Sequence, residues 1–119
     1  MKLWPIVAVA LGGALGTLGR IGADLAMAGL PGDHEWATLG VNLLGSLGLG
    51  IVMGHGLPGL SRALRDGLTV GVLGSYTTMS GVAVIAVALP TLGAVYVLGT
   101  VTLGIAVAWM GYLAGRRLS

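Results

Sequence analysis

Long apolar segments fill almost the whole chain, and short polar or turn-rich segments separate them. The apolar windows are residues 4–30, 37–57, 67–89 and 92–115. A helix needs roughly 20 residues to cross about 30 Å of hydrocarbon, and each window is close to that length. The pattern therefore predicts an all-α integral membrane protein with four transmembrane helices in one domain, residues 1–119. Between the second and third windows, residues 61–66 are a candidate for a short interfacial helix.

The third window carries a polar run near its middle, residues 74–80 with the sequence GSYTTMS. Within hydrocarbon, polar groups must find partners inside the protein, so a polar run at membrane depth usually lines a water path or an ion site. The run should lie near the bilayer midplane, and we expect the function of the protein to lie there.

Composition supports the membrane assignment and excludes several kinds of chemistry. Hydrophobic residues make up 55% of the chain and charged residues 8%, with a mean hydropathy of +0.97, whereas soluble domains are about 25% charged. Without cysteine the chain has no disulfide, no thiol chemistry and no cysteine metal site. No nucleophile, base and orienting group come together, and His34 and His55 stand singly near loops, so we expect no enzyme. The net charge of +2 does not indicate a nucleic-acid partner.

Glycine is unusually frequent, with 23 residues in 119, and many of the glycines repeat at intervals of four. Small residues at this spacing let helix backbones approach closely in membranes. The small-residue positions are Gly12 and Gly16, then Ser46, Gly50 and Gly54, then Gly104 and Ala108, and finally Gly111 and Gly115. They predict tight helix packing, either within one subunit or between two subunits.

Two polar stripes run along the predicted helices at intervals of four residues, which places each stripe on one helix face. They are Thr38, Asn42 and Ser46 on the second helix, and Tyr96, Thr100 and Gly104 on the fourth. Hydroxyl and amide donors can bind a partly dehydrated anion without a fixed charge that would trap it. The same stripes could instead form an interhelical hydrogen-bond ladder, worth only about 0.6 kcal/mol per contact. Spacing alone leaves both interpretations open.

Three sequence blocks cover most of the chain in order: GGALG at residues 12–16 followed by Arg20, TLGVNLLGS at 38–46, and GVLGSYTTMS at 71–80. Together they resemble the signatures of the Fluc (CrcB) family of fluoride channels. The resemblance implies passive fluoride export through an antiparallel dimer, in which two four-helix subunits have opposite orientations. It also implies two pores and a central structural sodium ion at the broken third helices.

The resemblance assigns roles to individual residues. The backbone carbonyls of Gly74 and Thr77 would bind sodium, and the fluoride path would include Asn42, Ser46, Ser80, Tyr96 and Thr100. Carbonyl oxygens freed by a broken helix suit a hard cation. An ion-free alternative exists, because the hydroxyls of Thr77 and Thr78 can bond back to the carbonyl four residues earlier and bend the helix.

The chain departs from the family pattern in the second half of the third block. It contains no phenylalanine, and Met79 and Val82 stand where the family has its two pore phenylalanines. A thioether or isopropyl group lacks the positive ring edge that would face an anion. One interpretation is sequence drift in a working homodimer, with methionine as an adaptable filler. The other is that a second subunit supplies the aromatic residues.

Basic residues are concentrated on one side of the predicted membrane domain. That side holds both termini and the loop between the second and third helices, with Lys2, Arg62, Arg65, Arg116 and Arg117. The other loops contain no lysine or arginine, and only Arg20, one turn before Asp24, lies toward the opposite side. The positive-inside rule then predicts one orientation in the lipid of a bacterial inner membrane, with cytoplasmic termini. A single orientation favours a heterodimer with a second family member of opposite topology over a homodimer.

Two other functions remain as alternatives. A small multidrug transporter would need a carboxylate within the membrane, but the one acid of the first helix, Asp24, lies near the helix end beside Arg20. A non-conducting scaffold subunit is the stronger alternative, because the missing aromatic residues are compatible with a silent pore.

Overall fold

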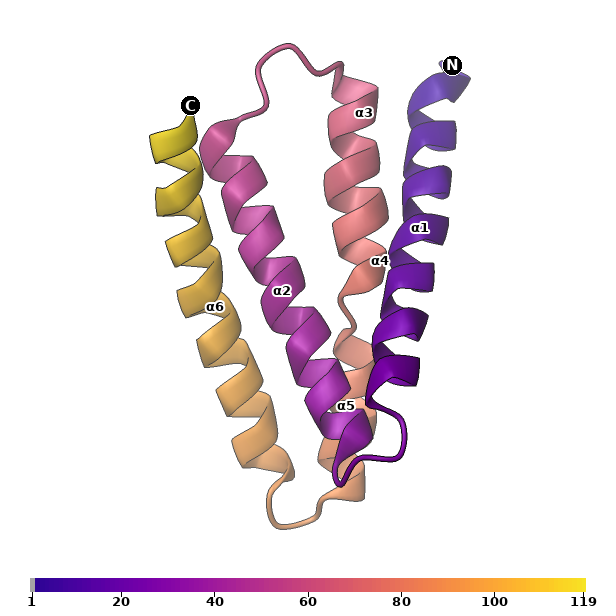
Figure 1. Cartoon of the computed structure of the whole chain (residues 1–119), viewed down its shortest axis with the longest axis vertical. Coiled ribbons are helices and arrows are strands. Elements are labelled where there is room, and N and C mark those ends of the chain that lie inside the picture. Colours follow the sequence, from indigo (N-terminus) through magenta and orange to yellow (C-terminus); the bar gives the residue numbers. More distant parts are fainter. Residues whose placement is uncertain (1) are drawn as a thin grey trace.

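The computed structural model describes residues 2–119 as a bundle of long helices with overall dimensions of 47 × 30 × 25 Å (Figure 1). The elements in chain order are α1 (Leu3–Met27), α2 (Asp33–His55), α3 (Arg62–Asp66), η1 (Gly67–Leu73), α4 (Gly74–Tyr76), α5 (Met79–Ala88) and α6 (Gly93–Leu118). The elements from α3 to α5 follow one another along a single span, Arg62–Ala88. This span and the other three helices are each long and apolar enough to cross a membrane. The prediction of a four-helix membrane protein is confirmed.

The first two helices end and begin where the local backbone sets the boundary. α1 ends at Met27 rather than at residue 30, and α2 begins at Asp33 rather than at residue 37. Gly29 and Gly32 turn the chain between them with φ angles of +88° and +68°, which glycine adopts without steric cost. Asp33 Oδ2 accepts a hydrogen bond from the Gly29 N–H at 3.0 Å and closes this turn.

The polar segment 61–66 does not form a separate interfacial helix. Ser61 Oγ accepts a hydrogen bond from the Leu64 N–H at 3.3 Å and caps the start of α3. α3 then continues directly into η1, because Gly67 has helical backbone angles. A helix is therefore found at the expected position, Arg62–Asp66, but it is the first part of the third span rather than a separate element.

The glycine-rich faces pack helices together within the subunit. α1 lies along η1 and α4, and a Cβ at Gly16 would overlap the carbonyl oxygen of Val72. α2 lies along α6, and a Cβ at Gly50 would overlap the carbonyl oxygen of Ala108. Both pairs run side by side in Figure 1. The tight packing that the sequence predicts is thus found inside one subunit at these positions.

Little of the surface of the four spans is buried within the subunit. Between 11% and 28% of the most apolar window of each span is buried. Outward-facing side chains such as Leu25 and Val87 are 71% and 83% exposed. This surface suits a protein that is surrounded by lipid or by further transmembrane helices.

The third span is irregular in its middle. η1 is wound as a π-helix, a rare form that is frequently found at functional sites. Helical backbone ends at Tyr76, and Thr77 and Thr78 have extended ψ angles of 155° and 115° before α5 begins at Met79. Figure 1 shows this non-helical link between α4 and α5. The irregular backbone lies in the polar run 74–80 of the sequence.

Candidate functional site

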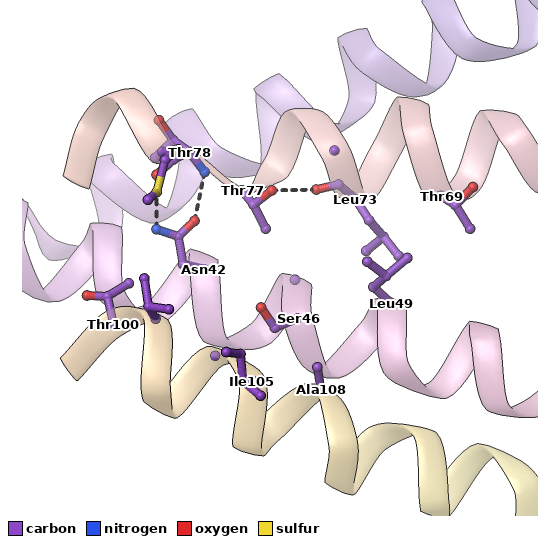
Figure 2. Close-up of a pocket in the computed structure, with 15 residues that line it drawn as sticks. Asn42, Ser46, Leu49, Thr69, Leu73, Thr77, Thr78, Thr100, Ile105 and Ala108 are labelled. Atoms are coloured by element: carbon purple, nitrogen blue, oxygen red, sulfur yellow. Dashed lines mark hydrogen bonds between the residues drawn. The ribbon is translucent and has the colours of Figure 1, made fainter. Parts of the chain in front are cut away.

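A cavity of about 390 Å³ lies between α2, the third span and α6, and Figure 2 shows its lining. The polar lining residues are Asn42 and Ser46 on α2, Thr69, Thr77 and Thr78 on the third span, and Thr100 on α6. Apolar side chains and glycines complete the lining, and no charged side chain contributes to it. Hydroxyl and amide groups without fixed charge can hold water or a partly dehydrated anion without trapping it.

Asn42 is hydrogen-bonded to the backbone of Thr78 in both directions. Its Nδ2 donates to the Thr78 carbonyl at 3.0 Å, and its Oδ1 accepts from the Thr78 N–H at 2.7 Å (Figure 2). In an uninterrupted helix the Thr78 N–H would donate to the Gly74 carbonyl. Asn42 therefore supplies the acceptor that the interruption removes.

The two threonines of the link bond differently. The N–H and the hydroxyl of Thr77 both donate to the Leu73 carbonyl, at 3.2 and 3.1 Å. This is the hydroxyl back-bonding that bends a helix without an ion. The Thr78 hydroxyl instead accepts from the Gly81 N–H at 3.0 Å and caps the start of α5. The back-bonding alternative drawn from the sequence thus holds for Thr77 and is wrong for Thr78.

These bonds deprive two backbone carbonyls of their usual helical donors. The Thr78 N–H donates to Asn42 and not to the Gly74 carbonyl. The Gly81 N–H donates to the Thr78 hydroxyl and not to the Thr77 carbonyl. Carbonyl oxygens released in this way are ligands that a hard cation such as Na⁺ prefers, so the donor chemistry here fits a cation site. Within residues 2–119, no three His, Asp or Glu side chains gather into an alternative metal site.

Thr100 carries a buried hydroxyl that has no hydrogen-bond partner in the described part of the chain. The residue is 7% exposed and lines the same cavity as Asn42 and Ser46. Leaving a buried hydroxyl unpaired costs about 1–3 kcal/mol. The hydroxyl is therefore available to a polar partner in the cavity, such as water, an anion or a group of another subunit.

Three of the residues that the resemblance assigns to the fluoride path do not line this cavity, and they are Ser80, Val82 and Tyr96. The Tyr96 hydroxyl donates to the Glu35 carbonyl at 2.8 Å, where α2 and α6 begin. Val82 is 1% exposed and belongs to the core. Met79, in contrast, is 65% exposed and lines the cavity. The two positions that replace the family's phenylalanines therefore have different surroundings.

A second cavity of about 360 Å³ lies between α1, α2 and α5. Its polar and charged lining residues are Thr17, Arg20, Asp24, His34, Thr38, Thr78 and Ser80. No ion pair joins Arg20 to Asp24, and within residues 2–119 the one ion pair is Arg62 to Asp66 at 3.8 Å. Thr78 lines both cavities, a position that the spacing of the sequence does not reveal.

Comparison with known proteins identifies the family. Residues 7–112 match the family model described as CrcB-like protein, Camphor Resistance (CrcB). A Thermus thermophilus relative named fluoride-specific ion channel FluC is 42% identical over 117 residues, which cover 92% of this chain and 94% of the relative. Relatives of the same name from Nitratidesulfovibrio vulgaris and Geobacter sulfurreducens are 37% and 35% identical, over 93% and 95% of this chain and 96% and 98% of their own. This multi-pass membrane protein therefore belongs to the CrcB (FluC) family, which comprises ion channels and not enzymes.

Proposed function

We propose that this chain is a subunit of a fluoride channel, through which fluoride leaves the cell passively so that its toxicity is relieved. The observation that carries the proposal is the cavity beside the interrupted third span, which Asn42, Ser46 and Thr100 line with amide and hydroxyl groups. These groups offer donors to an anion, and no charged side chain is present to hold the anion too tightly. The names of the relatives support fluoride as the anion.

The conducting pore would form at the interface of two subunits in opposite orientations. In one subunit the cavity is open, because α6 meets the third span only at α5. A second subunit would cover the open side and part of the exposed apolar surface. Sodium would bind at the same interface to the carbonyls of Gly74 and Thr77. Gly74 lies on the subunit surface, as a cation site shared between two subunits requires.

The second subunit would be a different member of the family, located with this chain in the bacterial inner membrane. Met79 offers no aromatic ring to the cavity, so the ring-edge contacts of the ion path would come from the partner. A non-conducting scaffold subunit is the second candidate function. The burial of Val82 favours this candidate. Val82 lies in the core, so the position that is aromatic in the family contributes no side chain to the ion path here.

A reporter fused after Ser119 is expected to be cytoplasmic in essentially every molecule. The start of α1, the α3 segment and the end of α6 lie at the same end of the bundle (Figure 1), and the basic residues of the sequence cluster there. The positive-inside rule keeps such an end on the cytoplasmic side. Two fusions, one with a reporter active only in the cytoplasm and one active only outside, measure the orientation. Equal activity of the two fusions would reject the heterodimer and favour a dual-topology homodimer.

Fluoride efflux from liposomes tests the function itself. Liposomes that contain the purified protein with its partner subunit are expected to release fluoride down its gradient. Retention of fluoride by a folded and assembled pair would reject the channel in favour of the scaffold.

A further inference from the structure

We propose that Asn42 is a positioning residue that keeps the third span open at its interruption and so links the cation site to the anion path. The two hydrogen bonds between its side chain and the Thr78 backbone are called the amide clamp below. The identity of the two ions rests on the proposed function. The clamp rests only on the geometry of this chain.

The amide clamp occupies the carbonyl oxygen and one of the two N–H donors of the Asn42 side chain. Its carbonyl accepts from the Thr78 N–H at 2.7 Å, and one N–H donates to the Thr78 carbonyl at 3.0 Å. An asparagine has two N–H donors, so a single one remains for an anion in the cavity. Asn42 is also the only side-chain amide in the sequence.

The clamp prevents the third span from forming the helical hydrogen bond that would occupy the Gly74 carbonyl. A backbone N–H at membrane depth must find an acceptor within the protein. If Asn42 were absent, the Thr78 N–H would need another acceptor, and continued helical winding would supply the Gly74 carbonyl. That bond would occupy one of the two candidate cation ligands. By taking the Thr78 N–H itself, Asn42 keeps the Gly74 carbonyl available.

The clamp also lies at the junction of the two cavities. Thr78 lines both, while Asn42 lines the first together with Ser46 and Thr100. A change in the Thr78 backbone therefore alters the walls of both cavities and the neighbouring Thr77 carbonyl at once. This coupling separates the clamp from a simple anion donor. Loss of a donor would change only the passage of the anion, whereas loss of the clamp weakens cation binding as well.

Hydrogen exchange at the Thr78 amide and stabilisation by sodium test the clamp directly. The variant Asn42→Ala, purified with its partner subunit in lipid nanodiscs, is expected to exchange the Thr78 amide about tenfold faster or more, the change that loss of one or two hydrogen bonds produces. The sodium concentration for half-maximal thermal stabilisation is expected to rise by a similar factor of about ten. The matched control is Ser46→Ala, one turn further along the same helix face in the same cavity, which should leave both readouts unchanged.

The near-isosteric variant Asn42→Leu keeps the test decisive even where the alanine variant fails to fold. A leucine side chain fills similar space but can neither donate to the Thr78 carbonyl nor accept from its N–H. Protection of the Thr78 amide, corrected for intrinsic exchange, is therefore expected to drop in this variant about as far as in Asn42→Ala.

Unchanged Thr78 exchange in both variants would overturn the clamp. Slower fluoride flux with unchanged exchange and unchanged sodium binding would make Asn42 an anion donor alone and would equally overturn the proposal. Absence of flux in the unaltered pair would reject the proposed function instead, because Thr78 exchange does not depend on conduction.

Discussion

Val82→Phe is expected to destabilise the protein strongly, whereas Met79→Phe is expected to leave its stability nearly unchanged. Val82 is 1% exposed, so a phenyl ring at this position must displace core neighbours. Overpacking of a core typically costs about 1–3 kcal/mol. Met79 is 65% exposed and borders the cavity, where a ring of similar size can take its place. Thermal unfolding of the two variants in the same detergent measures the difference.

Fluoride flux of the same two variants tests where an aromatic ring can act. Met79→Phe places a ring edge at the cavity and is expected to raise the flux or leave it unchanged. Val82→Phe is expected to lower the flux in proportion to the loss of folded protein. A Val82→Phe variant that is as stable as the parent and conducts faster would contradict the core position of Val82.

Gly16→Ala is expected to weaken the packing of α1 against the third span. The added Cβ would overlap the carbonyl oxygen of Val72, a backbone atom that cannot turn aside. The helices must separate to accommodate it, at a cost of about 1–3 kcal/mol in the free energy of unfolding. Denaturation in mixed detergent micelles measures this change.

Gly22 provides the matched control on the same helix, because no atom lies within 4 Å of the position of its Cβ. Gly22→Ala is therefore expected to be neutral, or stabilising by up to about 1 kcal/mol through helix propensity. Equal stabilities of the two alanine variants would mean that α1 does not pack on the third span through its glycine face.

Hydropathy and small-residue spacing were sufficient to predict the four spans and their close packing. The reason is physical: a membrane span must be long and apolar, and glycine at intervals of four produces a smooth helix face. The ends of the helices were less predictable. Gly29 and Gly32 set the first turn through their positive φ angles, which a hydropathy window does not register.

The environments of Met79 and Val82 could not be predicted from their spacing. Residues three apart share a helix face, so the spacing of the two residues predicts the same burial for both. In the structure Met79 is the first residue of α5 and borders the cavity, whereas Val82, one turn later, is covered by neighbouring helices. The burial of each residue thus depends on how the helices cross, and the spacing of residues in the sequence does not predict the crossing.

The sequence identified Asn42 as a site residue but not its partner. Its polar stripe indicated a donor that faces an anion path, and the structure joins the side chain to the Thr78 backbone. A signal was nevertheless present, because a helix interruption leaves an N–H that needs an acceptor, and Asn42 is the only amide side chain available. The π-helical winding of η1 has no comparable signal in the sequence.

The most direct test of the proposed channel is the release of ions from liposomes that contain this protein together with its partner subunit. The liposomes are loaded with equal concentrations of fluoride and chloride, and a potassium ionophore prevents a voltage from building up. Ion-selective electrodes follow both anions, and protein-free liposomes serve as the control. We expect fluoride to leave rapidly and chloride to stay inside. Retention of fluoride by a folded and assembled pair, or equal release of both anions, would contradict a fluoride channel.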